Sequence, residues 1–195
     1  KYMDHVEIKK YADSWKPQTD YFWLNGKPLD FYAWYPYNSA EGTSGIPAGM
    51  TLNSEDFSSI SYTVPTDVSK QEDLMFAVKK NASEPADGNA TSLDFKHSLA
   101  AVKFVVGDLP TGVTVKSIKL KNIAKNGNYS LVSDEWTVDF GADNLGDFSV
   151  LENGSAIKDN IYPSDGGVAF LIPQSLDRAQ ENADKNPSVE VVLND

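Results

Sequence analysis

The feature that most constrains this chain is an alternation of apolar and polar residues with a period of two. The alternation is clearest at residues 60–64, 74–78, 136–140 and 189–193. Successive side chains of a β-strand point to opposite faces of a sheet, so this period predicts strands with one buried face. Helical periodicity is scarce, and turn residues separate the apolar runs. The pattern therefore predicts an all-β protein built from antiparallel β-sandwich structure.

Three further stretches predict strands with less regular patterns. Residues 31–35 form a continuous aromatic run, which is typical of a strand covered on both faces. Residues 99–106 and 168–172 are short apolar runs. Between residues 113 and 120 the apolar positions change phase after Val115, so we expect a β-bulge near Lys116 and Ser117.

The chain length allows one large sandwich or two small ones. The 195 residues include a polar segment at 81–92, NASEPADGNATS, which has no large apolar residue. Such a segment has nothing with which to build a core. We predict a linker here, which divides the chain into an N-terminal β-sandwich domain at 1–92 and a C-terminal β-sandwich domain at 93–195. The alternative is a long hairpin loop within a single sandwich.

Charge and composition exclude several classes of function. The net charge is −11, and Arg178 is the single arginine, so the chain has almost no means of binding nucleic acid. It has no cysteine, which removes disulfides, zinc thiolate sites and thiol catalysis. The sequence starts at Lys1 without an initiator methionine, so we expect a processed product or a fragment, and any export signal is expected upstream of it.

The sequence contains no pattern that indicates catalysis. The histidines are His5 and His97, and His97 is followed by Ser98. Neighbouring residues of a strand point to opposite faces, so Ser98 is expected to face away from His97. No Gly-x-Ser-x-Gly nucleophile motif is present. We therefore predict no catalytic residues, no cofactor and no enzyme activity. A pair of carboxylates for glycoside hydrolysis, distant from each other in the chain, is the alternative that stays open.

The densest acidic cluster consists of Asp139, Asp143, Asn144 and Asp147. Calcium takes six to eight oxygen ligands, and an acidic loop supplies several of them. The spacing differs from that of an EF-hand loop. We therefore favour a solvated loop and predict no metal site, with weak calcium binding as the alternative.

Aromatic residues crowd the stretch 15–37. If they are exposed on one face, Trp15, Trp23 and Trp34 are the candidates for an aromatic patch that binds carbohydrate or a host protein. The competing interpretation is an aromatic core, which we favour for the run at 31–35. Four Asn-x-Ser/Thr sequons also predict surface positions if the host glycosylates, at Asn81, Asn89, Asn128 and Asn153.

Several short motifs follow one another in an order that resembles the fimbrillin family of Bacteroidales-type bacteria, in particular its minor-fimbrillin-like branch. They are LDFYAWYP (29–36), DLMFA (73–77), LDFKHSLA (93–100) with VKF (102–104), the strand at 115–123 with GNY (127–129), and LIPQ (171–174). Each motif is weak alone. Their order and spacing span most of the chain and make the resemblance fairly specific.

The resemblance implies two tandem transthyretin-like antiparallel β-sandwich domains. It also implies a lipoprotein precursor exported to the outer membrane and assembled into surface fimbriae (pili). The subunits would pair by β-strand exchange, in which a partner's strand fills a groove lined by apolar strand residues. Family members usually carry strands and a lipobox before the segment that matches Lys1, and they continue past Asp195. The first domain is therefore expected to be incomplete in this chain. Contact with the membrane is expected only through a lipid anchor that lies outside this sequence.

The sequence thus predicts a fimbrial structural or accessory tip subunit that supports adhesion at the cell surface. Its expected partners are other fimbrial subunits, with a host glycan or host protein as a further one. The alternative function is a surface module that binds carbohydrate or a host protein.

Overall fold

The computed structural model describes residues 2–53, 55–86, 89–163, 167–177 and 185–194. These residues form antiparallel sheets and contain no α-helix, only short 3-10 turns such as η1 (Val68–Lys70) and η3 (Ala142–Asn144). The predicted all-β class is therefore confirmed. The arrangement as two tandem transthyretin-like domains stays a prediction.

Three sheets have three or four strands. The first has the order β13 (Leu145–Leu151), β10 (Thr114–Ala124), β16 (Ser188–Asn194). The second has the order β12 (Glu135–Thr137), β11 (Asn126–Ser130), β5 (Ser59–Thr63), β4 (Met50–Leu52). The third has the order β3 (Leu29–Tyr35), β6 (Met75–Ala82), β7 (Lys96–His97).

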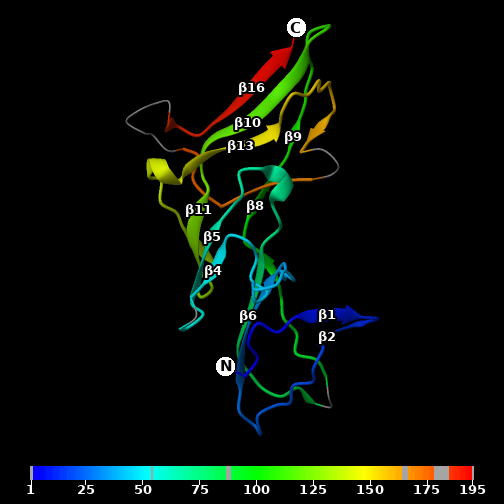
Figure 1. Ribbon diagram of the computed structural model, residues 1–195, viewed down its shortest axis with the longest axis vertical. Coiled ribbons are helices and arrows are strands. Elements are labelled where there is room, and N and C mark those ends of the chain that lie inside the picture. The colour runs from blue at the N-terminus through cyan, green and yellow to red at the C-terminus, as the bar shows by residue number, and fades with distance from the viewer. Residues whose placement is uncertain (1, 54, 87–88, 164–166, 178–184, 195) are drawn as a thin grey trace.

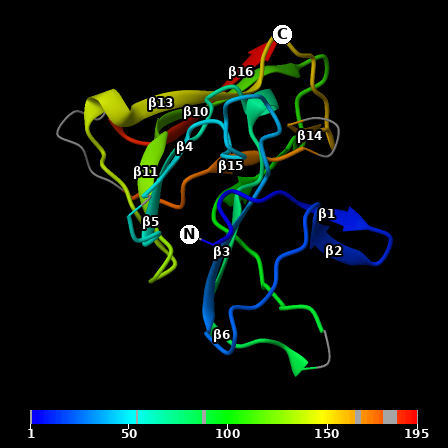
Figure 2. The ribbon, with the colours of Figure 1, turned by 60° about the horizontal axis from the view of Figure 1, so that its bottom comes forward.

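Three two-stranded pairs complete the described structure. They are β1 (Ile8–Tyr11) with β2 (Ser14–Pro17), β9 (Phe104–Val105) with β14 (Ile161–Tyr162), and β8 (Ala100–Val102) with β15 (Ala169–Leu171). The molecule is elongated, with β16 at one end and the ribbon of β3 and β6 toward the other (Figure 1). The β1–β2 hairpin stands out sideways from the body in both ribbon views (Figures 1 and 2).

Most predicted strands are confirmed, with informative differences. The bulge is present, because the register of β10 against β16 shifts between Val115 and Ser117. This shift keeps Val115 and Ile118 on the same buried side. The run at 99–106 is broken at Lys103 into β8 and β9. The prediction that residues 31–35 are covered on both faces is wrong, since β3 is mostly half-buried and Tyr35 is 50% exposed.

One hydrophobic cluster runs through the centre of the molecule and joins distant parts of the chain. It extends from Met50 to Ile172, and Ile60 and Phe148 are among its most buried members. Strand β5 pairs with β11, and Ile60 lies directly opposite Tyr129. Sheet pairing and the core therefore both cross the expected boundary after residue 92. The division into domains at 1–92 and 93–195 stays a prediction.

The polar segment that was predicted as a linker connects two strands of one sheet. Strand β6 ends at Ala82 and β7 begins at Lys96, and the two are antiparallel neighbours. The described residues on either side of 87–88 therefore join antiparallel neighbours of one sheet, and the linker between two domains stays a prediction.

Two half-buried glutamine side chains form hydrogen bonds with backbone groups at the ends of strand ladders. Gln174 of the LIPQ motif accepts a hydrogen bond from Ala124 N at 2.9 Å and donates one to Ala124 O at 3.0 Å. Gln71 donates to Pro65 O at 2.7 Å and accepts from Phe170 N at 2.6 Å. Each amide satisfies backbone groups that would otherwise lack a partner where the ladders end.

A polar network ties the second sheet to the third. The Tyr129 hydroxyl donates to Asp134, whose other carboxylate oxygen lies 2.5 Å from Lys96 Nζ. Trp136 Nε1 donates to Ser98 O at 2.6 Å, and the Tyr129 ring lies between Trp136 and Phe76. Burial, together with the hydrogen bond to Asp134, raises the pKa of Tyr129 well above its ordinary value. The hydrogen bonds from Lys96 and Tyr129 lower the pKa of Asp134.

Candidate assembly edge and aromatic surface

Strand β16 presents core-facing side chains that the rest of the molecule leaves half uncovered. Its three alternate residues Val189, Val191 and Leu193 lie directly opposite Leu120, Ile118 and Val115 of β10. Directly opposite residues of an antiparallel pair share a face of the sheet. The three β10 residues are at most 5% exposed, whereas the three β16 residues are 50–51% exposed. The buried face of this sheet therefore continues onto β16 without cover.

The same strand also has an unpaired edge. In the described part of the chain β16 pairs with β10 alone and ends the sheet order on that side. An edge strand presents unpaired N–H and C=O groups, which form a template for another strand. Burying the remaining half of three aliphatic side chains is worth on the order of 3 kcal/mol, from about 1.5–3 kcal/mol for each full side chain. Edge and face together make β16 a candidate site for adding a strand.

The sequence predicted β16 as a strand with a buried face but not its exposure. The alternation at 189–193 marks the apolar face correctly. Whether that face is covered depends on the layer above it, which a local pattern does not encode. The sequence signal that bears on this exposure is the order of the motifs that resemble the fimbrillin family. That resemblance implies a groove that a partner's strand fills.

The three candidate tryptophans do not share one environment. Trp15 lies on β2 and is 67% exposed. Trp34 is half-buried against the hydrophobic cluster, and its Nε1 donates to Gly45 O at 2.9 Å. Trp23 is half-buried and makes an edge contact with Phe31, at 6.0 Å between ring centroids. The aromatic patch formed by all three stays a prediction, and Trp15 is its accessible member.

Other exposed aromatic rings lie in the same N-terminal stretch. Phe22 is 75% exposed, and its backbone N–H donates to the Tyr2 hydroxyl, which in turn donates to Phe22 O. Tyr2 also makes an edge contact with Tyr21. Surface aromatic groups therefore gather before residue 40, at the opposite end of the sequence from the aliphatic residues of β16.

The histidine and serine that follow each other in sequence are turned apart. Ser98 is buried, and its hydroxyl donates to Leu74 O at 2.8 Å. His97 is exposed, and its Nδ1 lies 2.7 Å from a carboxylate oxygen of Asp73. The expectation that Ser98 faces away from His97 is confirmed. The side chain of His97 is 69% exposed.

The acidic loop that was considered for calcium is occupied by internal contacts. Asn144 donates to Asp139 O and Asn126 O, and Asp147 forms an ion pair with Lys121 at 2.8 Å. Within the described residues, no group of three or more histidine, cysteine, aspartate or glutamate side chains is arranged to hold a metal ion. The described part likewise contains no helix with the length and apolar character needed to cross a membrane.

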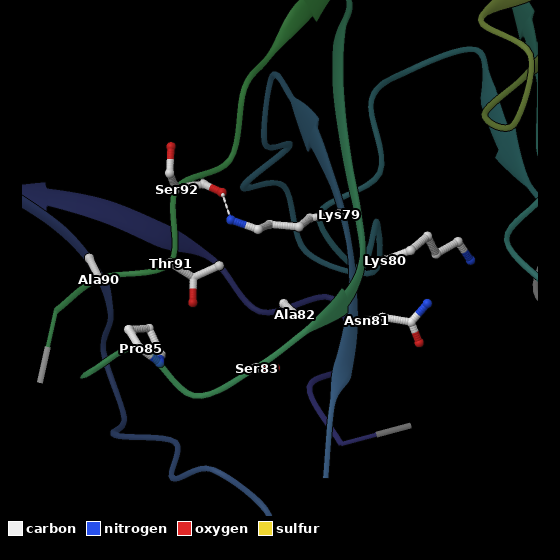
Figure 3. Close-up of a pocket in the computed structure, with 9 residues that line it drawn as sticks. All are labelled: Lys79, Lys80, Asn81, Ala82, Ser83, Pro85, Ala90, Thr91 and Ser92. Atoms are coloured by element: carbon white, nitrogen blue, oxygen red, sulfur yellow. Dashed lines mark hydrogen bonds between the residues drawn. The ribbon is translucent and has the colours of Figure 1, made fainter. Parts of the chain in front are cut away.

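The connection after β6 encloses an open cavity of about 410 Å³ that is lined by polar and small residues (Figure 3). Lys79 reaches across it and donates to Ser92 O at 3.1 Å, while Lys80 points to the other side. The cavity carries no cluster of chemical groups typical of catalysis. Asn81 at the end of β6 and Asn89 on the connection are exposed, as are Asn128 and Asn153, so all four sequons lie at the surface.

The fold of the chain is similar to that of a solved structure. This is a protein from Bacteroides ovatus ATCC 8483 described as a "putative cell adhesion protein", with 18% sequence identity and a TM-score of 0.52. The match covers 87% of this chain and 59% of that protein, so this chain spans little more than half of its length. No curated protein matches the sequence.

The sequence pattern of one family extends over nearly the whole chain. The family is described as Fimbrillin-like, and its match covers residues 1–194. The motifs at 29–36, 73–77, 93–104 and 171–174 fall within this match. The chain belongs to the Fimbrillin-like family.

Proposed function

We propose that the chain is a structural or accessory tip subunit of a cell-surface fimbria, which assembles by β-strand exchange and supports adhesion. The Fimbrillin-like family is structural rather than catalytic, and membership implies a surface protein. Anchoring to the outer membrane through a lipid outside this sequence belongs to the same proposal.

The observation that carries the proposal is the uncovered core face of β16. Natural proteins rarely leave a flat, apolar edge strand open, because it invites pairing with other chains. The exposed stripe of Val189, Val191 and Leu193 is adjacent to the unpaired edge. An added strand from a neighbouring subunit would extend the backbone ladder and cover this stripe. Backbone hydrogen bonds then supply affinity, and the alternate side chains supply specificity.

The proposal predicts assembly that depends on the apolar face of β16. Concentrated protein, before and after limited trypsin treatment, is examined for SDS-resistant ladders. Val191→Glu places a charge on the face that the added strand covers, so the ladders should disappear while the monomer keeps its circular dichroism spectrum. Val132→Glu is the matched control, since Val132 is 77% exposed and lies away from β16, in the turn between β11 and β12. Wild-type protein that stays monomeric, or ladders that survive Val191→Glu, would refute the proposal.

A second candidate function is binding of carbohydrate or a host protein, and a specific observation favours it. Trp15 and Phe22 are mostly exposed, whereas the aromatic residues after position 40, apart from Phe95, are buried or half-buried. A flat exposed ring stacks on the apolar face of a sugar. A glycan array probed with the intact chain tests this function, and binding that is lost in Trp15→Ala, with the fold retained, supports it.

A further inference from the structure

We propose that the β1–β2 hairpin binds an anionic polysaccharide, whose sugar rings stack on Trp15 and whose carboxylate groups pair with Lys10. This inference rests on the second candidate function above, and it names the ligand class and the site. The exposure of the hairpin, the register of its two strands and its charge support this ligand.

The hairpin is accessible on both faces. Every residue of β1 is exposed, and so is every residue of β2 except the half-buried Pro17. In both ribbon views the hairpin extends away from the sheets (Figures 1 and 2). A ligand therefore reaches these side chains without displacing any other part of the described structure.

The register places Lys10 and Trp15 side by side. They are directly opposite each other in the antiparallel pair, so they share one face, with Cβ atoms roughly 5 Å apart. The next pair on that face is Ile8 and Pro17. This face is a narrow strip with a cation, a broad aromatic ring and two apolar side chains. These four residues form the Lys10–Trp15 strip.

The hairpin is positive in a strongly negative chain. Residues 8–17 contain three lysines and one aspartate, whereas the whole chain has a net charge of −11. Charges separated by more than about 8 Å are largely screened at physiological ionic strength. An anionic group close to the hairpin therefore responds to these lysines rather than to the acidic body.

The lysines on the opposite face are engaged within the hairpin. Lys9 pairs with Glu7 at 2.8 Å, and Lys16 lies 5.3 Å from the centre of the Tyr11 ring. Among the described residues, no carboxylate forms an ion pair with Lys10. Lys9 and Lys16 also lie directly opposite each other, and like charges in that position destabilise a strand pair. A polyanion on the opposite face, that of Lys10 and Trp15, pairs with the charge of Lys10.

The shape of the strip favours a polysaccharide over other anionic partners. A linear chain of sugar rings fits a flat two-stranded strip, and the C–H face of a ring packs on the indole while a uronate carboxylate reaches the ammonium. An acidic peptide would satisfy Lys10 but has no flat apolar surface to cover Trp15. An anionic membrane is broad, so it would also meet the acidic body of the protein and be repelled.

The test measures binding of the full chain to polygalacturonate, with dextran as a neutral polymer and polyglutamate as an acidic polypeptide. Lys10→Gln and Trp15→Ala are compared with two matched controls outside the hairpin, Lys27→Gln and Phe95→Ala, whose side chains are also exposed. Circular dichroism verifies that each variant is folded.

We expect polygalacturonate to bind more tightly than dextran or polyglutamate. Either hairpin variant should weaken this binding roughly tenfold, the change expected for the loss of one charged or stacking contact, and the controls should leave it unchanged. Raising the salt concentration from about 0.05 M to about 0.5 M should weaken the wild type more than Lys10→Gln.

Three results would overturn the inference. They are the absence of polygalacturonate binding, equal binding of polyglutamate, and equal losses in the hairpin variants and the controls. A chain that binds neutral glycans through Trp15 but not polygalacturonate would retain the second candidate function and refute only the anionic ligand.

Discussion

Replacing Ile60 and Phe148 with alanine, one at a time, tests whether the two halves of the chain unfold as one unit. Ile60 is 1% exposed and Phe148 is 0% exposed, and both belong to the same hydrophobic cluster. They lie on opposite sides of the boundary predicted after residue 92. Loss of the side chain removes its transfer free energy and leaves a cavity, which costs about 2–5 kcal/mol for Ile→Ala and about 3–5 kcal/mol for Phe→Ala.

These free energies convert into large shifts of the unfolding temperature. For a chain of 150–250 residues, each 1 kcal/mol lowers Tm by about 2–4 °C, so a loss of about 4 kcal/mol lowers it by roughly 8–16 °C. Differential scanning calorimetry should reveal one transition that both variants lower, because the β5–β11 pairing and the shared cluster couple the halves. Val132→Ala, at a 77% exposed position, should change the free energy of unfolding by less than about 0.5 kcal/mol. Two transitions, of which each variant lowers a different one, would refute this reasoning and support separate domains.

Three further predictions concern polar contacts and the hairpin. Gln174→Ala should lower the free energy of unfolding in urea by about 1–3 kcal/mol, because it leaves Ala124 N–H and C=O without partners; a loss below about 0.5 kcal/mol would contradict this role. The pKa of Asp134 is lowered by its hydrogen bonds from Lys96 and Tyr129, so its contribution is fully present above the ordinary value of 3.8 and is lost as the pH falls through the lowered pKa. Thermal unfolding should therefore separate wild type from Asp134→Asn at neutral pH, and the difference should shrink as the pH falls below 3.8; a constant difference would argue against the contact. Trp15→Ala should leave Tm unchanged within about 2 °C, because Trp15 is 67% exposed, and a larger fall would indicate that the hairpin packs on the body.

Local patterns predicted much of the fold because strands with one buried face leave a clear trace in sequence. The alternation at 60–64 and 189–193 corresponds to β5 and β16, and the phase change after Val115 corresponds to the bulge in β10. Partner choice was harder to predict. The pairing of β5 with β11 joins residues 63 to 71 positions apart, and no local pattern specifies such a contact. For the same reason, no local pattern shows that β6 and β7, which lie on either side of the polar segment, are neighbours in one sheet.

Identifying the candidate site required tertiary contacts even more than predicting the fold did. Aromatic crowding identified Trp15, Trp23 and Trp34 together, but only the strand register and the burial separate the exposed Trp15 from the half-buried Trp34. The β1–β2 hairpin was not predicted, because its residues do not alternate in polarity. The exposure of Val189, Val191 and Leu193 was also inaccessible to sequence, since a strand's own pattern does not show whether a layer covers it.

The most direct test of the central claim is hydrogen exchange of the β16 backbone, measured on the monomer and on assembled protein. If a neighbouring subunit adds a strand beside β16, amides of residues 188–194 that exchange rapidly in the monomer should become protected in the oligomer. Amides of β5, which is already paired on both sides by β4 and β11, should be protected in both states. Oligomers in which residues 188–194 exchange as fast as in the monomer would contradict assembly by strand exchange at this edge.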